Sequence, residues 1–118
     1  MSTIQKFEDL EIWQLARVVC DDIFKIIANT DLKNDYKLKE QINGASGSIM
    51  DNIAEGFERD GNKEFTQFLS IAKASCGETR SQLYRISDRK YIDEDTFTDL
   101  KDKTLLLGNK IGAFIKYL

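Results

Sequence analysis

Residues 48–56 read Ser-Ile-Met-Asp-Asn-Ile-Ala-Glu-Gly and are polar at places where an ordinary bundle helix is apolar. At helical spacing they continue one polar face, made of Gln41, Ala45, Ser48, Asn52 and Glu55. An apolar face runs directly beside it and is suited to a protein core; it consists of Leu38, Ile42, Ala45 or Ser46, Ile49, Ile53 and Phe57. A polar stripe beside an apolar one indicates groups that bond to a neighbouring helix or to another subunit.

Apolar residues recur at helical spacing along most of the chain and predict helices at about residues 8–28, 37–58, 62–89 and 94–117. Residues 29–35 are polar and predict a connection, and Gly61 supplies the positive φ of a turn. Asp93 has the place of an N-cap, with Ile92 and Phe97 spaced for a hydrophobic staple. Four amphipathic helices with short links predict an all-α, antiparallel up-down-up-down four-helix bundle, one domain over residues 1–118.

If the chain reverses near Gly61, the second and third helices are antiparallel. Residues of the two helices then lie level where their numbers add up to about 121. Two groups of small residues, 44–48 and 74–77, then face each other. Glycine in a helix interior costs about 1 kcal/mol relative to alanine. Either the two backbones approach closely here, or a groove is left open for a ligand or a partner.

The 118 residues include no proline and no histidine. Without histidine, the commonest general base and every Ser-His or Cys-His pair are excluded. Glu55 and Glu78 are the remaining candidates, but the predicted register separates them by about 18 Å along the helices. We therefore expect no catalytic residue, no cofactor and no metal site within one subunit. A carboxylate metal site could form only where two subunits meet.

No apolar run reaches the ~20 residues of a membrane span, and residues 1–6 lack the apolar core of a signal peptide. Cys20 and Cys76 stand apart among apolar or small neighbours, which favours buried free thiols over a disulfide. These features predict a cytoplasmic protein that has no contact with membranes.

The net charge of −3 argues against a generic nucleic-acid binder. The densest basic run is a candidate surface for nucleic-acid contact and consists of Arg80, Arg85, Arg89 and Lys90. The alternative reading is solvated helix surface paired with nearby acids.

The sequence resembles a bacterial four-helix bundle family whose first members are encoded by intervening sequences within large-subunit ribosomal RNA genes. The residues that carry the resemblance are Gln41-Ile42, Ala45, Ser48-Ile49, Asn52-Ile53-Ala54-Glu55-Gly56, Phe65, Phe68-Leu69, Ile71-Ala72, Ser75, Glu78 and Gln82-Leu83, with Phe7-Glu8-Asp9-Leu10, Ile12-Trp13-Gln14 and Ala16 before them. The resemblance implies a left-handed bundle that assembles as a ring-like homo-oligomer, a pentamer. The family is similar to the accessory protein of diversity-generating retroelements, which works with a reverse transcriptase and RNA. Asn43 and Gly44 replace two arginines that the family usually carries, which weakens a nucleic-acid role.

Three functions remain open. The first is a non-enzymatic, homo-oligomeric interaction or scaffold protein that takes a protein partner, in which apolar residues beside the main stripes, such as Ile12, Phe24, Tyr84 and Tyr117, contact other copies. The second is an RNA or nucleoprotein accessory factor, associated with a reverse transcriptase or ribosomal RNA. The third is a carboxylate metal site at a subunit interface. If the protein is an interaction or scaffold protein, one set of polar residues forms a buried network or an interface. The set is Gln41, Ser48, Asn52, Glu55, Ser75 and Glu78.

Overall fold

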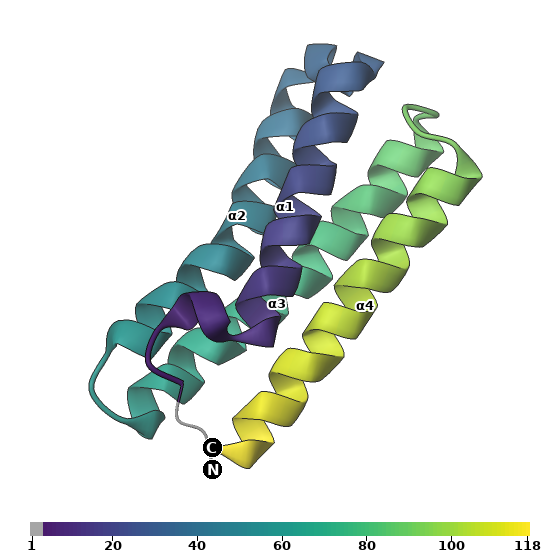
Figure 1. Cartoon of the computed structure of the whole chain (residues 1–118). Helices are drawn as coiled ribbons and strands as arrows, with labels where there is room; N and C mark the ends of the chain where they lie inside the picture. Colours follow the sequence, from purple (N-terminus) through teal and green to yellow (C-terminus); the bar gives the residue numbers. More distant parts are fainter. Residues whose placement is uncertain (1–3) are drawn as a thin grey trace.

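Four long helices carry the apolar stripes: α1 (Glu11–Asn29), α2 (Tyr36–Glu58), α3 (Asn62–Asp88) and α4 (Glu94–Tyr117). The computed structural model describes residues 4–118, and no strand occurs within that range. Short 3₁₀ helices, η1 (Phe7–Asp9) and η2 (Asp31–Asn34), precede α1 and α2. The fold is therefore the all-α, four-helix arrangement that the periodicity predicts (Figure 1).

The first helix begins at Glu11, so the predicted start at residue 8 is wrong. Leu10 has an extended backbone and separates η1 from α1, which lets its side chain enter the core. The break also returns Phe7 onto Trp13, whose ring centroid lies 5.2 Å away in an edge-to-face contact. Gln14 donates a hydrogen bond to the Glu8 carbonyl at 2.9 Å. Burial of Leu10 and the contact of Phe7 with Trp13 thus accompany the interruption of the helix.

The connection before α2 is more ordered than its polar composition predicts. Leu32 is fully buried in η2, and its N–H is accepted by the Thr30 hydroxyl at 3.2 Å. The α2–α3 turn has Gly61 at a φ of 92°, the left-handed region that glycine adopts without strain. Asp93 caps α4 by accepting a hydrogen bond from the Thr96 N–H at 2.8 Å, as the sequence predicts.

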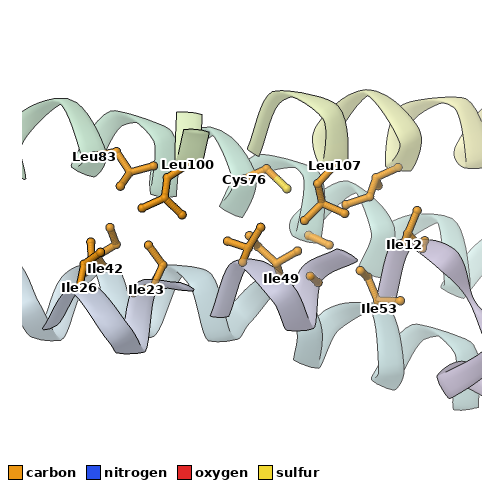
Figure 2. Packing of buried hydrophobic residues seen from close by; sticks show 14 of the residues in the cluster. Ile12, Ile23, Ile26, Ile42, Ile49, Ile53, Cys76, Leu83, Leu100 and Leu107 are labelled. Atoms are coloured by element: carbon orange, nitrogen blue, oxygen red, sulfur yellow. The ribbon is translucent and has the colours of Figure 1, made fainter. Parts of the chain in front are cut away.

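The core lies between the pair α1 and α2 and the pair α3 and α4. Figure 2 shows Ile23, Ile42 and Ile49 pointing toward Leu83, Leu100 and Leu107 across this space. All six of these side chains are almost completely buried. Burying one such side chain stabilises the fold by about 1.5–3 kcal/mol, so this apolar layer supplies the main driving force.

Neighbouring helices contact each other in the order of the chain, and α1 also contacts α4. Lys103 and Lys110 of α4 pair with Asp22 and Glu11 of α1, so the numbering rises along one helix as it falls along the other. The result is an elongated bundle of 46 × 23 × 19 Å (Figure 1). Its left-handed turn stays a prediction.

Candidate functional site

The polar residues of α2 and α3 meet in the middle of the bundle. Ser75 donates a hydrogen bond to the Ser48 hydroxyl at 3.0 Å. Asn52 donates to the same hydroxyl at 2.9 Å and to the Ser48 carbonyl at 2.8 Å. Ser75 is buried, and Ser48 and Asn52 are half-buried. We call these three residues the polar seam; the bond from Ser75 to Ser48 joins the two helices, and the bonds from Asn52 hold Ser48 within α2.

The other residues of the predicted network bond elsewhere. Gln41 accepts a hydrogen bond from Arg85 at 3.1 Å. Glu55 accepts one from Arg59 at 3.2 Å, within its own helix. Glu78 accepts one from Gln82 at 3.4 Å, also within its own helix. The structure therefore brings Ser48, Asn52 and Ser75 together and leaves the two glutamates outside the seam.

The sequence analysis did not assign Gln82 to the polar network. Its side chain is buried, and its Oε1 atom accepts no hydrogen bond from residues 4–118. A buried acceptor without a partner costs about 1–3 kcal/mol. The available signal was a glutamine beside Thr79, Leu83 and Ile86 on the apolar side of α3.

The observed register differs from the predicted one. Ser48 bonds to Ser75, two residues beyond Lys73, which the reversal near Gly61 places level with it. The pair Gln41 and Arg85, whose side chains are longer, departs further from the predicted register. Side chains in a helix lean toward its N-terminus, so in an antiparallel pair two long side chains meet at positions whose backbones are not level. The short serine pair therefore reports the backbone register.

Three glycines of the small-residue groups, Gly44, Gly47 and Gly77, do not mark a close approach of the α2 and α3 backbones. Beyond its own helix backbone, a Cβ built on Gly44, Gly47 or Gly77 would meet no atom of residues 4–118 within 4 Å. The prediction of tight packing at these glycines is wrong, because they lie on outward faces and not between the two helices. The second reading, an open groove, is the one that the geometry fits.

Two open grooves include these glycines. The first lies along α1 and α2, has a volume of about 550 Å³ and is named the acidic groove, since its one charged residue is Asp51. Its lining is Cys20, Asn43, Gly44, Ser46, Gly47, Ser48, Asp51 and Asn52. The Cys20 thiol donates to the Ser46 carbonyl at 3.2 Å. Burial raises the pKa of the Cys20 thiol, the bond to Ser46 lowers it, and the nearby charge of Asp51 raises it.

The second groove lies between α3 and α4, has a volume of about 220 Å³ and is named the basic groove. Its lining is Lys73, Cys76, Gly77, Arg80, Leu105, Gly108 and Asn109. Burial raises the pKa of the Cys76 thiol to about 12, while the charges of Arg80 and Lys73 oppose this shift. Both cysteines are free thiols.

The predicted basic run does not form one surface. Arg85 bonds to Gln41 on the α2 side of α3, and Arg89 pairs with Asp35. Arg80, five residues before Arg85, lies about 140° from it around the helix and lines the basic groove. Lys90 follows the helix in the left-handed region, with a φ of 63°. The structure therefore separates the four candidate contacts into different environments.

No cluster of three or more Cys, Asp or Glu side chains within residues 4–118 is placed to hold a metal ion. In the same part of the chain no helix is long and apolar enough to cross a membrane.

These features define a four-helix bundle with a central polar seam and two open grooves of opposite charge. Residues 8–113 match the family described as 23S rRNA-intervening sequence protein, and the chain belongs to that family. A solved structure with the same fold is a protein of unknown function from the S23 ribosomal protein family of Bacteroides thetaiotaomicron VPI-5482. The two chains share 19% identity over 89% of this chain and 98% of the other, with a TM-score of 0.80. None of the curated proteins matches this chain.

Proposed function

We propose that the protein is a non-enzymatic, homo-oligomeric scaffold of the cytoplasm that offers its helix faces to other copies and to a protein partner. The observation that carries the proposal is the open space over Gly44, Gly47 and Gly77. Each glycine costs its helix about 1 kcal/mol, and no packing within the described residues, 4–118, offsets that cost. A backbone from outside the chain that approaches these positions would offset it.

Exposed apolar side chains support the same conclusion. Phe24 is 64% exposed and Tyr84 49% exposed, and Ile71 and Leu106 are exposed to a similar degree. Ile12, which the sequence analysis assigned to the same group, is buried in the core. These side chains are available for contacts with other copies, and a contact surface forms where such side chains gather in one patch.

Sedimentation velocity of the pure protein at micromolar concentrations tests the proposal. We expect a species heavier than one chain. Gly47→Leu should weaken this assembly, because the added side chain occupies the space that a partner backbone needs. Circular dichroism should show unchanged helix content, since a Cβ at Gly47 has no neighbour within 4 Å from other elements of the described chain.

Ala28→Leu is the matched control, because it adds a similar side chain at an exposed position near the end of α1. It should leave the assembly unchanged. A wild-type protein of monomer mass would overturn the proposal, and equal assembly of wild type and Gly47→Leu would remove the observation that carries it.

An RNA or nucleoprotein accessory role is the second candidate. It is supported by the name of the family, which refers to 23S rRNA, and by Lys73 and Arg80, which form no ion pair within residues 4–118. A carboxylate metal site between subunits is less well supported, because Glu55 and Glu78 already accept hydrogen bonds within their own helices.

A further inference from the structure

The two grooves carry opposite charges that no ion pair within residues 4–118 neutralises. Asp51 lines the acidic groove, and Lys73 and Arg80 line the basic groove. The ion pairs found within residues 4–118 involve none of the three. Each groove therefore presents charge to whatever occupies it.

The charge of each groove reaches the thiol in its lining. Burial is the largest influence on the pKa of both cysteines, and it raises both. Beyond burial, Asp51 raises the pKa of Cys20, whereas Arg80 and Lys73 lower that of Cys76. Asp51 therefore lies near the Cys20 thiol in one groove, and Arg80 and Lys73 lie near the Cys76 thiol in the other.

Both grooves also leave room for a helix to approach. Among the described residues, no atom beyond the helix's own backbone lies within 4 Å of a Cβ built on Gly44 or Gly47 in the acidic groove or on Gly77 in the basic groove. The basic groove, at about 220 Å³, is smaller than the roughly 300–1,000 Å³ of pockets for drug-sized ligands. Its size and charge fit an acidic side chain carried on a helix.

The acidic groove of this same protein presents such a side chain. Asp51 is exposed on α2, with Gly47 one turn before it. The two grooves lie along different helix pairs, α1 with α2 and α3 with α4. A contact between them joins unlike surfaces of two copies and leaves one groove of each kind free, so further copies can add.

We propose that the acidic groove of one copy docks head-to-tail on the basic groove of the next, with Asp51 of one chain facing Lys73 and Arg80 of its neighbour. The proposal rests on the homo-oligomer proposed above and names its contact surface. Repetition of the contact produces a ring if the rotation between copies closes, and a filament if it does not.

Charge reversal tests the contact in the full-length protein. Asp51→Lys alone, and Lys73→Glu with Arg80→Glu, each place like charges across the contact, so we expect dissociation constants weaker by about tenfold or more. The triple variant that combines all three reversals restores opposite charges and should assemble again. It should not assemble with wild type, because that mixture returns like charges to the contact.

Matched controls carry the same change in net charge at exposed positions outside both grooves. Asp88→Lys is paired with Asp51→Lys, and Lys33→Glu with Lys37→Glu is paired with the double reversal. Sedimentation velocity measures assembly, and circular dichroism checks that every variant keeps its helices. Both controls should assemble like wild type.

The outcomes separate this inference from the proposed function. A monomeric wild type overturns both. An oligomer that the reversals weaken no more than their controls overturns the contact and leaves the oligomer in place. Weakening by the single and double reversals without recovery in the triple variant overturns the direct pairing of the grooves. Loss of RNA binding with intact assembly in the Lys73→Glu, Arg80→Glu variant overturns it in favour of RNA as the occupant of the basic groove.

Discussion

Gly56 closes the polar-and-apolar stretch of α2 and is the glycine with the tightest surroundings. A Cβ built on it would lie 2.6 Å from the Phe68 Cβ and 3.0 Å from the Phe65 ring. Close packing of α2 on the start of α3 thus requires glycine at this position, in contrast to the open positions at Gly44 and Gly47. Residues of one type therefore serve different purposes within one helix.

We predict that Gly56→Ala lowers the free energy of unfolding by about 1–3 kcal/mol, because the new methyl group overpacks a filled site. Gly112→Ala is the control: its nearest neighbour is the flexible end of Lys73 at 3.2 Å. The control should be neutral or stabilising, since alanine favours helix. Urea unfolding measures both, and equal effects would contradict the packing described for Gly56.

The two thiols differ in their access to solvent. Cys76 is 1% exposed and burial raises its pKa to about 12, whereas Cys20 is half-buried. Because the thiolate is the reactive form, we predict that iodoacetamide at about pH 8 modifies Cys20 first and Cys76 only after unfolding. Mass spectrometry locates the adduct. The Cys20→Ser variant should resist modification in buffer and react in urea; equal rates for both thiols in the native wild type would refute the prediction.

At the scale of the elements, a side-chain cap stabilises the start of α4. Asp93 starts α4, and the hydrogen bond from Thr96 lowers the pKa of its carboxyl group. A pKa lowered by folding contributes stability above the ordinary value of 3.8, and this contribution is lost as the pH falls through the folded value. The cap therefore acts fully at neutral pH.

We predict that Asp93→Ala lowers the urea midpoint at about pH 7, because the Thr96 N–H loses its acceptor. Asp95→Ala is the control, as Asp95 lies in the same first turn and accepts no capping bond within the described residues. Equal midpoints for the two variants would show that only the negative charge near the helix end matters.

Asp35 links the start of α2 to the turn between α3 and α4. Its Oδ2 atom accepts a hydrogen bond from the Tyr91 hydroxyl at 2.8 Å and another from Arg89. The Tyr91 bond is the largest cause of the lowered pKa of the Asp35 carboxyl, and Arg89 adds to it. One carboxylate thus ties together segments more than fifty residues apart in the chain.

We predict that Asp35→Asn lowers the free energy of unfolding at about pH 7. The lowered pKa means that the difference from wild type shrinks as the pH falls below 3.8 and through the folded value. Asp31→Asn, at an exposed position in η2, serves as the control. Urea unfolding across this pH range measures the effect, and a difference independent of pH would rule out the charged pair as its source.

At the scale of the whole molecule, the charges are spread over several faces. Arg85 and Arg89 bond to α2 and to the residue before it, and Arg80 lies in the basic groove. With a net charge of −3, no broad basic surface is built from the run that the sequence singled out.

We therefore predict weak, non-specific RNA binding by the isolated protein, lost between about 50 and 200 mM salt. Fluorescence anisotropy with a labelled RNA measures the binding. The Lys33→Glu, Lys37→Glu variant controls for the net charge of the Lys73→Glu, Arg80→Glu variant. Submicromolar binding that survives about 200 mM salt would reveal a specific RNA site.

The sequence by itself determined the four helices, because an apolar stripe, an N-cap such as Asp93 and a turn glycine such as Gly61 act through neighbouring residues. It also identified Ser48, Asn52 and Ser75 as polar groups beside a core. Only the tertiary structure decided that Ser48 meets Ser75, that Leu10 interrupts the first helix, and that Gly44 and Gly47 face open space while Gly56 is tightly packed. These outcomes depend on how helices distant in the chain pack together, and the spacing of residues along one helix carries no record of that packing.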